Sequence, residues 1–139
     1  ALAMQLLVLA AVTGGAFAAM VLAHWYLVTP KLPEAPLVVL SRILLGLLTL
    51  QVGLFAASMA LGAGVGGPFA ALTGTWALFL WLRLIIGLLF PLIVSWAAVQ
   101  TARTRSMESA TGLLYIDVGA IAAGTILAAG LYFGAGIIA

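Results

Sequence analysis

The first 28 residues of the chain contain no charged side chain, and no other feature restricts the possible folds so strongly. At ~1.5 Å per residue, such a helix exceeds the ~20 residues needed to cross a hydrocarbon core about 30 Å thick. Three further apolar runs follow. The chain is 66% hydrophobic and 6% charged, whereas soluble domains carry roughly 25% charged residues. We therefore expect an all-α integral membrane protein.

Four transmembrane helices are predicted, at residues 2–28, 36–61, 69–101 and 107–134. Together they make residues 1–139 a single transmembrane domain. Three prolines between residues 29 and 37 separate the first two helices, because proline fixes φ and has no N–H to donate. A glycine-rich turn ends the second helix, and it lacks the Lys-Ser/Thr of a phosphate-binding loop. Short connections of this kind predict an antiparallel up-down bundle.

The first apolar run has an alternative interpretation as a cleavable signal peptide. Gly15-Ala16-Phe17-Ala18 resembles a cleavage site of small residues. The run has no basic leader, however, and it continues without interruption to Val28. Both observations favour a membrane helix.

The basic residues of the connections predict the orientation. Lys31, Arg103 and Arg105 lie in the first and third connections, and the second connection has no charge. The positive-inside rule then places these basic turns in the cytoplasm and both termini outside, with a bacterial inner membrane as the expected location.

Composition also excludes several classes of function. A net charge of +2 is too small to indicate nucleic-acid binding. The chain has no cysteine, which excludes a disulfide, an iron–sulfur cluster and a thiolate metal site within it. No nucleophile–base arrangement is visible, so we do not expect an enzyme that acts alone.

The segment His24-Trp25-Tyr26 holds the only histidine, close to the end of the first helix. Histidine both donates and accepts hydrogen bonds, so His24 can bond a quinone carbonyl, ligate a haem or chlorophyll, or anchor the helix at the interface. A second histidine for bis-histidine haem ligation is absent. The sequence does not identify a cofactor. A quinone is the candidate it favours, a haem or chlorophyll held by one histidine ranks below it, and a structural role for His24 stays open.

Arg42 and Asp117 are charged residues inside membrane helices, where a charge costs roughly 2.5–3.5 kcal/mol on insertion scales. Arg42 shares a helix face with Gly46 and Gly53, which predicts that it faces protein. The depths of His24, Arg42 and Asp117 overlap, so we expect one polar cluster with Arg42 and Asp117 as an ion pair. The structural alternative is a pair that only neutralises charge and fixes helix packing.

The third helix contains Arg83 and Pro91. Pro91 cannot donate to the carbonyl of Gly87, so we expect a kink or a freed carbonyl there. Arg83 is expected in the outer half of the helix, in contact with lipid phosphates or a partner subunit, with an acidic cofactor group as the alternative.

The mixture of histidine, aromatics, arginine and acid in His24, Trp25, Tyr26, Arg42 and Asp117 resembles quinone-reactive, four-helix membrane anchor subunits of respiratory or photosynthetic electron-transfer complexes. The resemblance implies a small subunit that packs against other transmembrane subunits and lines a quinone site. A small four-helix transporter is the alternative. The small multidrug exporters carry a glutamate in their first helix, and Asp117 would have to replace it here.

Overall fold

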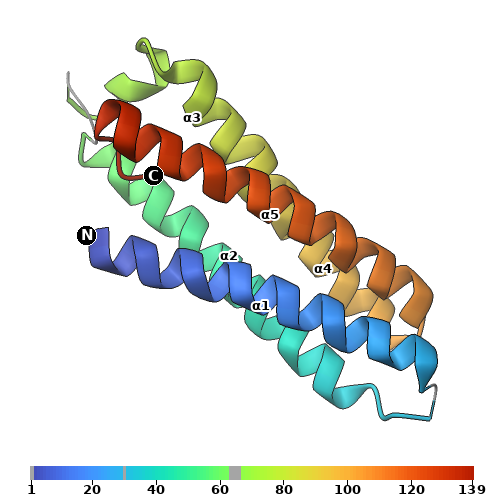
Figure 1. Ribbon diagram of the computed structural model, residues 1–139. Helices are drawn as coiled ribbons and strands as arrows, with labels where there is room; N and C mark the ends of the chain where they lie inside the picture. The colour runs from blue at the N-terminus through green and yellow to red at the C-terminus, as the bar shows by residue number, and fades with distance from the viewer. Residues whose placement is uncertain (1, 30, 63–66) are drawn as a thin grey trace.

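The computed structural model describes residues 2–29, 31–62 and 67–139, and within these ranges the ordered elements are all helical (Figure 1). Four helices are long and apolar enough to cross a membrane, the third being continuous from Ala77 to Arg103. This confirms the predicted all-helical class. The elements are α1 (Leu2–Val28), α2 (Ala35–Ala60), the 3₁₀ turn η1 (Ala70–Thr73), α3 (Ala77–Leu84), the π-helical turn η2 (Ile85–Leu89), α4 (Phe90–Arg103) and α5 (Met107–Ala135).

The bounds of α1, α2 and α5 lie within one residue of those predicted, but the third helix begins at Ala77 and not at 69. Phe69 has a left-handed φ of 58°, and Gly74 is extended, so the segment between them cannot continue as an α-helix. Trp81 Nε1 donates a hydrogen bond to the Leu72 carbonyl and holds this segment against α3. Pro30 and residues 63–66 of the predicted turns lie outside the described ranges.

The helices form a ring in which α1 and α4 each pack against both α2 and α5 (Figure 1). Among the described residues, two apolar clusters fill the interior. The larger one contains Val12, Leu44 and Leu114 and extends toward the α1–α2 and α4–α5 turns. The smaller one contains Phe55 and Leu80 and lies near the end that holds both termini.

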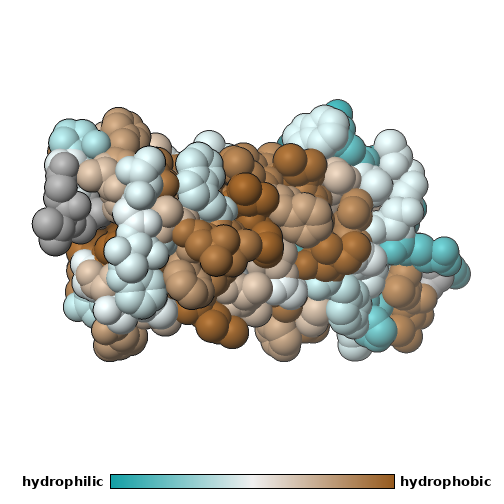
Figure 2. All heavy atoms as spheres, turned by 90° about the horizontal axis from the view of Figure 1, so that it is seen from above, coloured by the Kyte–Doolittle hydropathy of each residue, from teal (hydrophilic) through white to brown (hydrophobic). Residues whose placement is uncertain are grey.

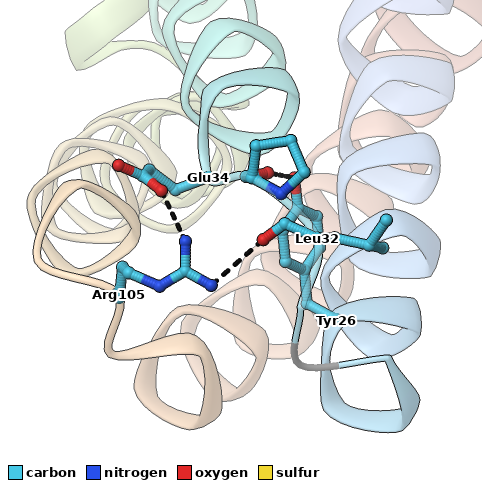
Figure 3. A network of polar contacts seen from close by, with 5 residues as sticks. Tyr26, Leu32, Glu34 and Arg105 are labelled. Carbon is cyan, nitrogen blue, oxygen red and sulfur yellow. Dashed lines mark hydrogen bonds and ion pairs between the residues drawn. The ribbon is translucent and has the colours of Figure 1, made fainter.

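The α1–α2 and α4–α5 turns lie at the same end of the bundle, and polar contacts join them (Figure 3). The guanidinium of Arg105 forms an ion pair with Glu34, 2.5 Å between Nη1 and Oε2, and donates a second hydrogen bond to the Leu32 carbonyl at 3.0 Å. A backbone hydrogen bond and the Arg105 contact lower the pKa of Glu34. Tyr26, buried at the end of α1, donates its hydroxyl to the Pro33 carbonyl. These contacts clamp the two turns together.

The surface seen in Figure 2 is most hydrophilic at one end and apolar along the middle. In Figure 2, hydrophobic residues cover the middle of the bundle, and the most hydrophilic ones gather at the end away from the grey atoms. Many large apolar side chains on the outer faces of the helices are exposed, among them Leu7, Phe17, Ile126 and Phe133. Such a surface is suited to lipid or to other apolar helices.

Candidate functional site

His24 and Trp25 point out of the bundle, whereas Tyr26 points into it. The reason is the helical rotation of ~100° per residue, which turns consecutive side chains to different faces. Trp25 is 59% exposed, and Tyr26 is 3% exposed. The His24 ring meets the Tyr115 ring of α5 edge to face, with centroids 6.4 Å apart. The exposed part of the predicted segment is therefore the His24 imidazole, which contacts the Tyr115 ring on the surface shared by α1 and α5, followed in the chain by the exposed Trp25 indole.

Arg42 is also exposed, so no helix of this chain covers the face on which we expect it to meet protein. The buried stripe of α2 runs through Ser41, Leu44, Leu48 and Gln51. Arg42 follows Ser41 and is turned by ~100° away from that stripe. Three residues on the same face turn outward with it, one, two and three turns further along the helix: Gly46, Thr49 and Gly53.

Asp117 is fully buried, and its only hydrogen-bond partner in the described chain is Ser95 of α4. The Ser95 hydroxyl donates to Oδ2, while Oδ1 has no partner there. The predicted ion pair between Arg42 and Asp117 is wrong, because Asp117 points into the bundle and Arg42 points out of it. No described hydrogen bond or ion pair joins His24 to either residue, so the three do not form the predicted polar cluster.

The sequence does contain a signal for the Ser95–Asp117 pair, although it was not used in the prediction. Ser95 and Asp117 lie eleven residues before and eleven residues after Ser106, the N-cap of α5 in the turn. Equal distances along two packed helices bring side chains to the same level of the bundle. A buried acid also needs a hydrogen-bond donor, and a serine at that level is the residue able to supply it.

Arg83 is 1% exposed, so the expectation that it meets lipid or a partner subunit is wrong. Its Nε donates to the Ala139 carbonyl and its Nη1 donates to the Gly87 carbonyl, both at 3.4 Å. Nη2 has no partner among the described residues. The burial follows from packing, because Arg83 lies on the face of α3 that also buries Leu80 and continues into η2.

Arg83 Nη1 donates to the Gly87 carbonyl, the group at which we predicted a kink or a freed carbonyl. Pro91 has no N–H to offer, and the helix loosens into the π-helical turn η2 just before it. At the same place α5 approaches η2 very closely through Gly124. A Cβ built on Gly124 would lie 2.6 Å from the Gly87 Cα, so only glycine fits this crossing. Arg83 therefore forms part of the close contact between η2 and α5.

These placements separate the polar residues into an interior set and an exterior set. Asp117, Ser95 and Arg83 lie inside the bundle and are bonded within the chain, whereas His24 and Arg42 lie outside and remain open to another molecule. Across residues 2–29, 31–62 and 67–139, no three His, Cys, Asp or Glu side chains gather to hold a metal ion. The sequence matches no protein-family model, and neither a curated protein nor a solved structure is significantly similar to it.

Proposed function

We propose that the four long helices cross a lipid bilayer in alternating directions, as an antiparallel bundle. Their lengths of 26 to 29 residues and mean hydropathies of 1.7 to 2.5 support this proposal, because a bilayer core needs ~20 apolar residues. The level pairing of Ser95 with Asp117 and of Gly87 with Gly124 supports opposite directions for the third and fourth spans.

In the proposed orientation the clamped turns lie in the cytoplasm and both termini lie outside, in a bacterial inner membrane. Lys31, Arg103 and Arg105 support it, since cytoplasmic loops are enriched in Lys and Arg. Cysteine labelling in whole cells tests this orientation. Two exposed threonines at opposite ends of the bundle are replaced singly, as Thr75→Cys and Thr104→Cys. A membrane-impermeant thiol reagent added outside should label only the Thr75→Cys variant. Labelling of only the Thr104→Cys variant would reverse the orientation.

We infer that the protein is a subunit of a larger membrane complex and that the outward stripe of α2 packs against another transmembrane chain. Gly46 and Gly53 on this stripe have no atom within 4 Å of a Cβ built on them, so a second helix can approach closely there. Arg42 on the same stripe would gain a partner for its charge.

Replacing one glycine of the stripe by a large side chain tests whether another helix packs there. Gly53→Leu should lower the native mass of the complex extracted in mild detergent, because leucine holds a second helix away. Gly112→Leu, at an equally open glycine of α5, is the matched control and should leave the mass unchanged. A native mass of a single chain for the unmodified protein would rule out the larger assembly.

For its function, we propose that the complex transfers electrons and that this chain lines a quinone site on the α1–α5 surface at His24. The exposure of His24 carries the proposal. A bound quinone headgroup would stack on Trp25 or Tyr115 and accept a hydrogen bond from the imidazole. This chain would then be an accessory subunit of an oxidoreductase, since the redox centres would belong to its partners.

The test of this function is quinone-linked turnover of the parent complex. His24→Ala should lower turnover per assembled complex, while His24→Gln, which keeps a hydrogen-bond donor, should retain more of it. Unchanged turnover in His24→Ala would refute the site. An absorption spectrum of the purified complex with a haem or chlorophyll band lost in both variants would instead favour ligation of that pigment by His24.

A further inference from the structure

A cavity of about 190 Å³ opens between α1 and α5 at the end of the bundle that holds the termini. Its walls are aliphatic and aromatic side chains, such as Leu6 and Leu9 of α1 and Tyr132 and Phe133 of α5. Residues 137–139, which fold back after α5, close one side. The cavity therefore belongs to the apolar surface of the bundle and is open to molecules dissolved in the membrane.

Among the described residues, four side chains with polar groups also line this cavity, namely Gln5, Gln51, Thr125 and Tyr132, and hydrogen bonds within the chain hold two of them. Gln5 Nε2 donates to Ser58 at 3.3 Å, and Thr125 donates to the Ile121 carbonyl at 2.9 Å. Gln51 differs from both. It is 2% exposed, and its buried Nε2 has no hydrogen-bond partner among the described residues. A buried amide without a partner costs free energy, so an occupant that bonds Gln51 would remove that cost.

The depth of Gln51 identifies the kind of molecule that can reach it. At ~1.5 Å per residue, Gln51 lies about 5 Å from the midpoint of α2, toward the end of the bundle that holds the termini. The hydrocarbon core extends ~15 Å on each side of the bilayer centre, and phospholipid ester carbonyls lie at its edges. An ester carbonyl therefore does not reach Gln51 without leaving its place, whereas a free membrane-soluble molecule brings its own carbonyl to that depth.

The volume limits the size of the bound part to one ring. A cavity of about 150 Å³ lined by aliphatic and aromatic side chains is large enough to bind benzene. At 190 Å³ this cavity has room for a substituted six-membered ring. We propose that it binds the ring of a membrane-soluble quinone. The Gln51 amide would turn toward the cavity so that its Nε2 donates a hydrogen bond to a ring carbonyl, and the isoprenoid tail would lie in the lipid beside Phe133.

This site goes beyond the proposed function and is separate from the His24 surface. His24 lies four residues before the end of α1, whereas the cavity lies along the first turns of that helix. The quinone would bind in the half of the bundle that holds the termini, and it would need no residue from another subunit. Each site is therefore removed by a different substitution.

The experiment measures binding by the purified full chain in detergent micelles. The probe is a benzoquinone carrying one isoprenoid unit, and binding is read as a saturable rise in the thermal unfolding temperature, since a ligand stabilises the folded state that binds it. Phosphatidylglycerol is titrated separately as the second probe. Gln51→Leu removes the donor and Ala129→Phe fills the cavity. The matched controls are Gln100→Leu and Ala123→Phe, at positions outside it.

The expected result is saturable binding of the quinone that Gln51→Leu weakens by about two-fold to about ten-fold, the range that one hydrogen bond contributes. Without ligand, Gln51→Leu should unfold at the same or a higher temperature, because it removes an unsatisfied amide. Ala129→Phe should abolish saturation, and both controls should bind like the unmodified protein.

Three results would overturn the proposal. The first is equal quinone affinity in Gln51→Leu and the unmodified protein. The second is stabilisation by phosphatidylglycerol, dependent on Gln51, without stabilisation by the quinone, which would make the occupant a lipid. The third is no saturable binding of either probe. His24→Ala distinguishes this site from the proposed function, because it should leave binding in the cavity unchanged while lowering turnover of the complex.

Discussion

Replacing Gly124 by alanine tests the closest approach between two helices in the bundle. A Cβ on Gly124 would lie 2.6 Å from the Gly87 Cα and 3.1 Å from the Gly87 carbonyl oxygen. Both are backbone atoms, so they cannot swing away as a side chain does. The same Cβ would lie 2.9 Å from Arg83 Nη1 and would press on the group that bonds the freed carbonyl. Gly124→Ala must therefore separate α5 from η2.

The matched control is Gly119→Ala on the same helix, where a Cβ meets no atom within 4 Å. Alanine is up to about 1 kcal/mol more favourable than glycine inside a helix, and both variants share this gain. Overpacking a tight contact costs about 1–3 kcal/mol. The free energy of unfolding should therefore be about 1–3 kcal/mol lower for Gly124→Ala than for Gly119→Ala.

The assay is reversible unfolding in mixed micelles with increasing denaturing detergent, followed by circular dichroism. The comparison between the two alanine variants removes the shared effect of helix propensity. Equal unfolding free energies for the two variants would show that η2 and α5 do not pack through these glycines. A loss of stability in Gly119→Ala alone would contradict the packing of α5 altogether.

Three further predictions concern the other polar contacts. The effects of Arg83→Met and Pro91→Ala on the unfolding free energy should be coupled by about 0.5–1.5 kcal/mol in a double-mutant cycle. The reason is that the Gly87 carbonyl, to which Pro91 cannot donate, can accept a hydrogen bond either from Arg83 or from the backbone N–H that alanine restores. Additive effects would contradict this. Ser95→Ala should lower the unfolding free energy by about 1–3 kcal/mol by leaving buried Asp117 without its donor, and adding Asp117→Leu should recover most of the loss. The native contacts of Glu34 lower its pKa, so this side chain stabilises the fold fully at pH values above its ordinary pKa of 4.5 and loses the effect as the pH falls below that value. Below pH 4.5 the thermal unfolding temperature of the unmodified protein should therefore decline more steeply than that of Glu34→Gln. Parallel declines in the two proteins would refute the contribution.

Length and hydropathy were sufficient to predict the helical class and most helix boundaries. Prolines before α2 and the left-handed Gly136 after α5 act within a few residues, so their effects are visible in the sequence. The late start of α3 was missed because apolar composition continues from Phe69 through Ala77 while the backbone does not remain helical. The loss of the usual backbone donor to the Gly87 carbonyl was predictable, because it depends only on a proline four residues later.

The directions of the charged side chains were decided by the tertiary structure. In a chain this apolar, every helix face is hydrophobic, so periodicity does not distinguish the lipid-facing side from the buried side. Arg83 became an interior residue and Arg42 an exterior one through helix rotation alone. Asp117 accepts a hydrogen bond from Ser95 and does not pair with Arg42, because α5 packs on α4 with Asp117 and Ser95 at the same level. Local signals specify where helices begin and end, whereas their rotation about their own axes is set by side-chain packing across the whole bundle.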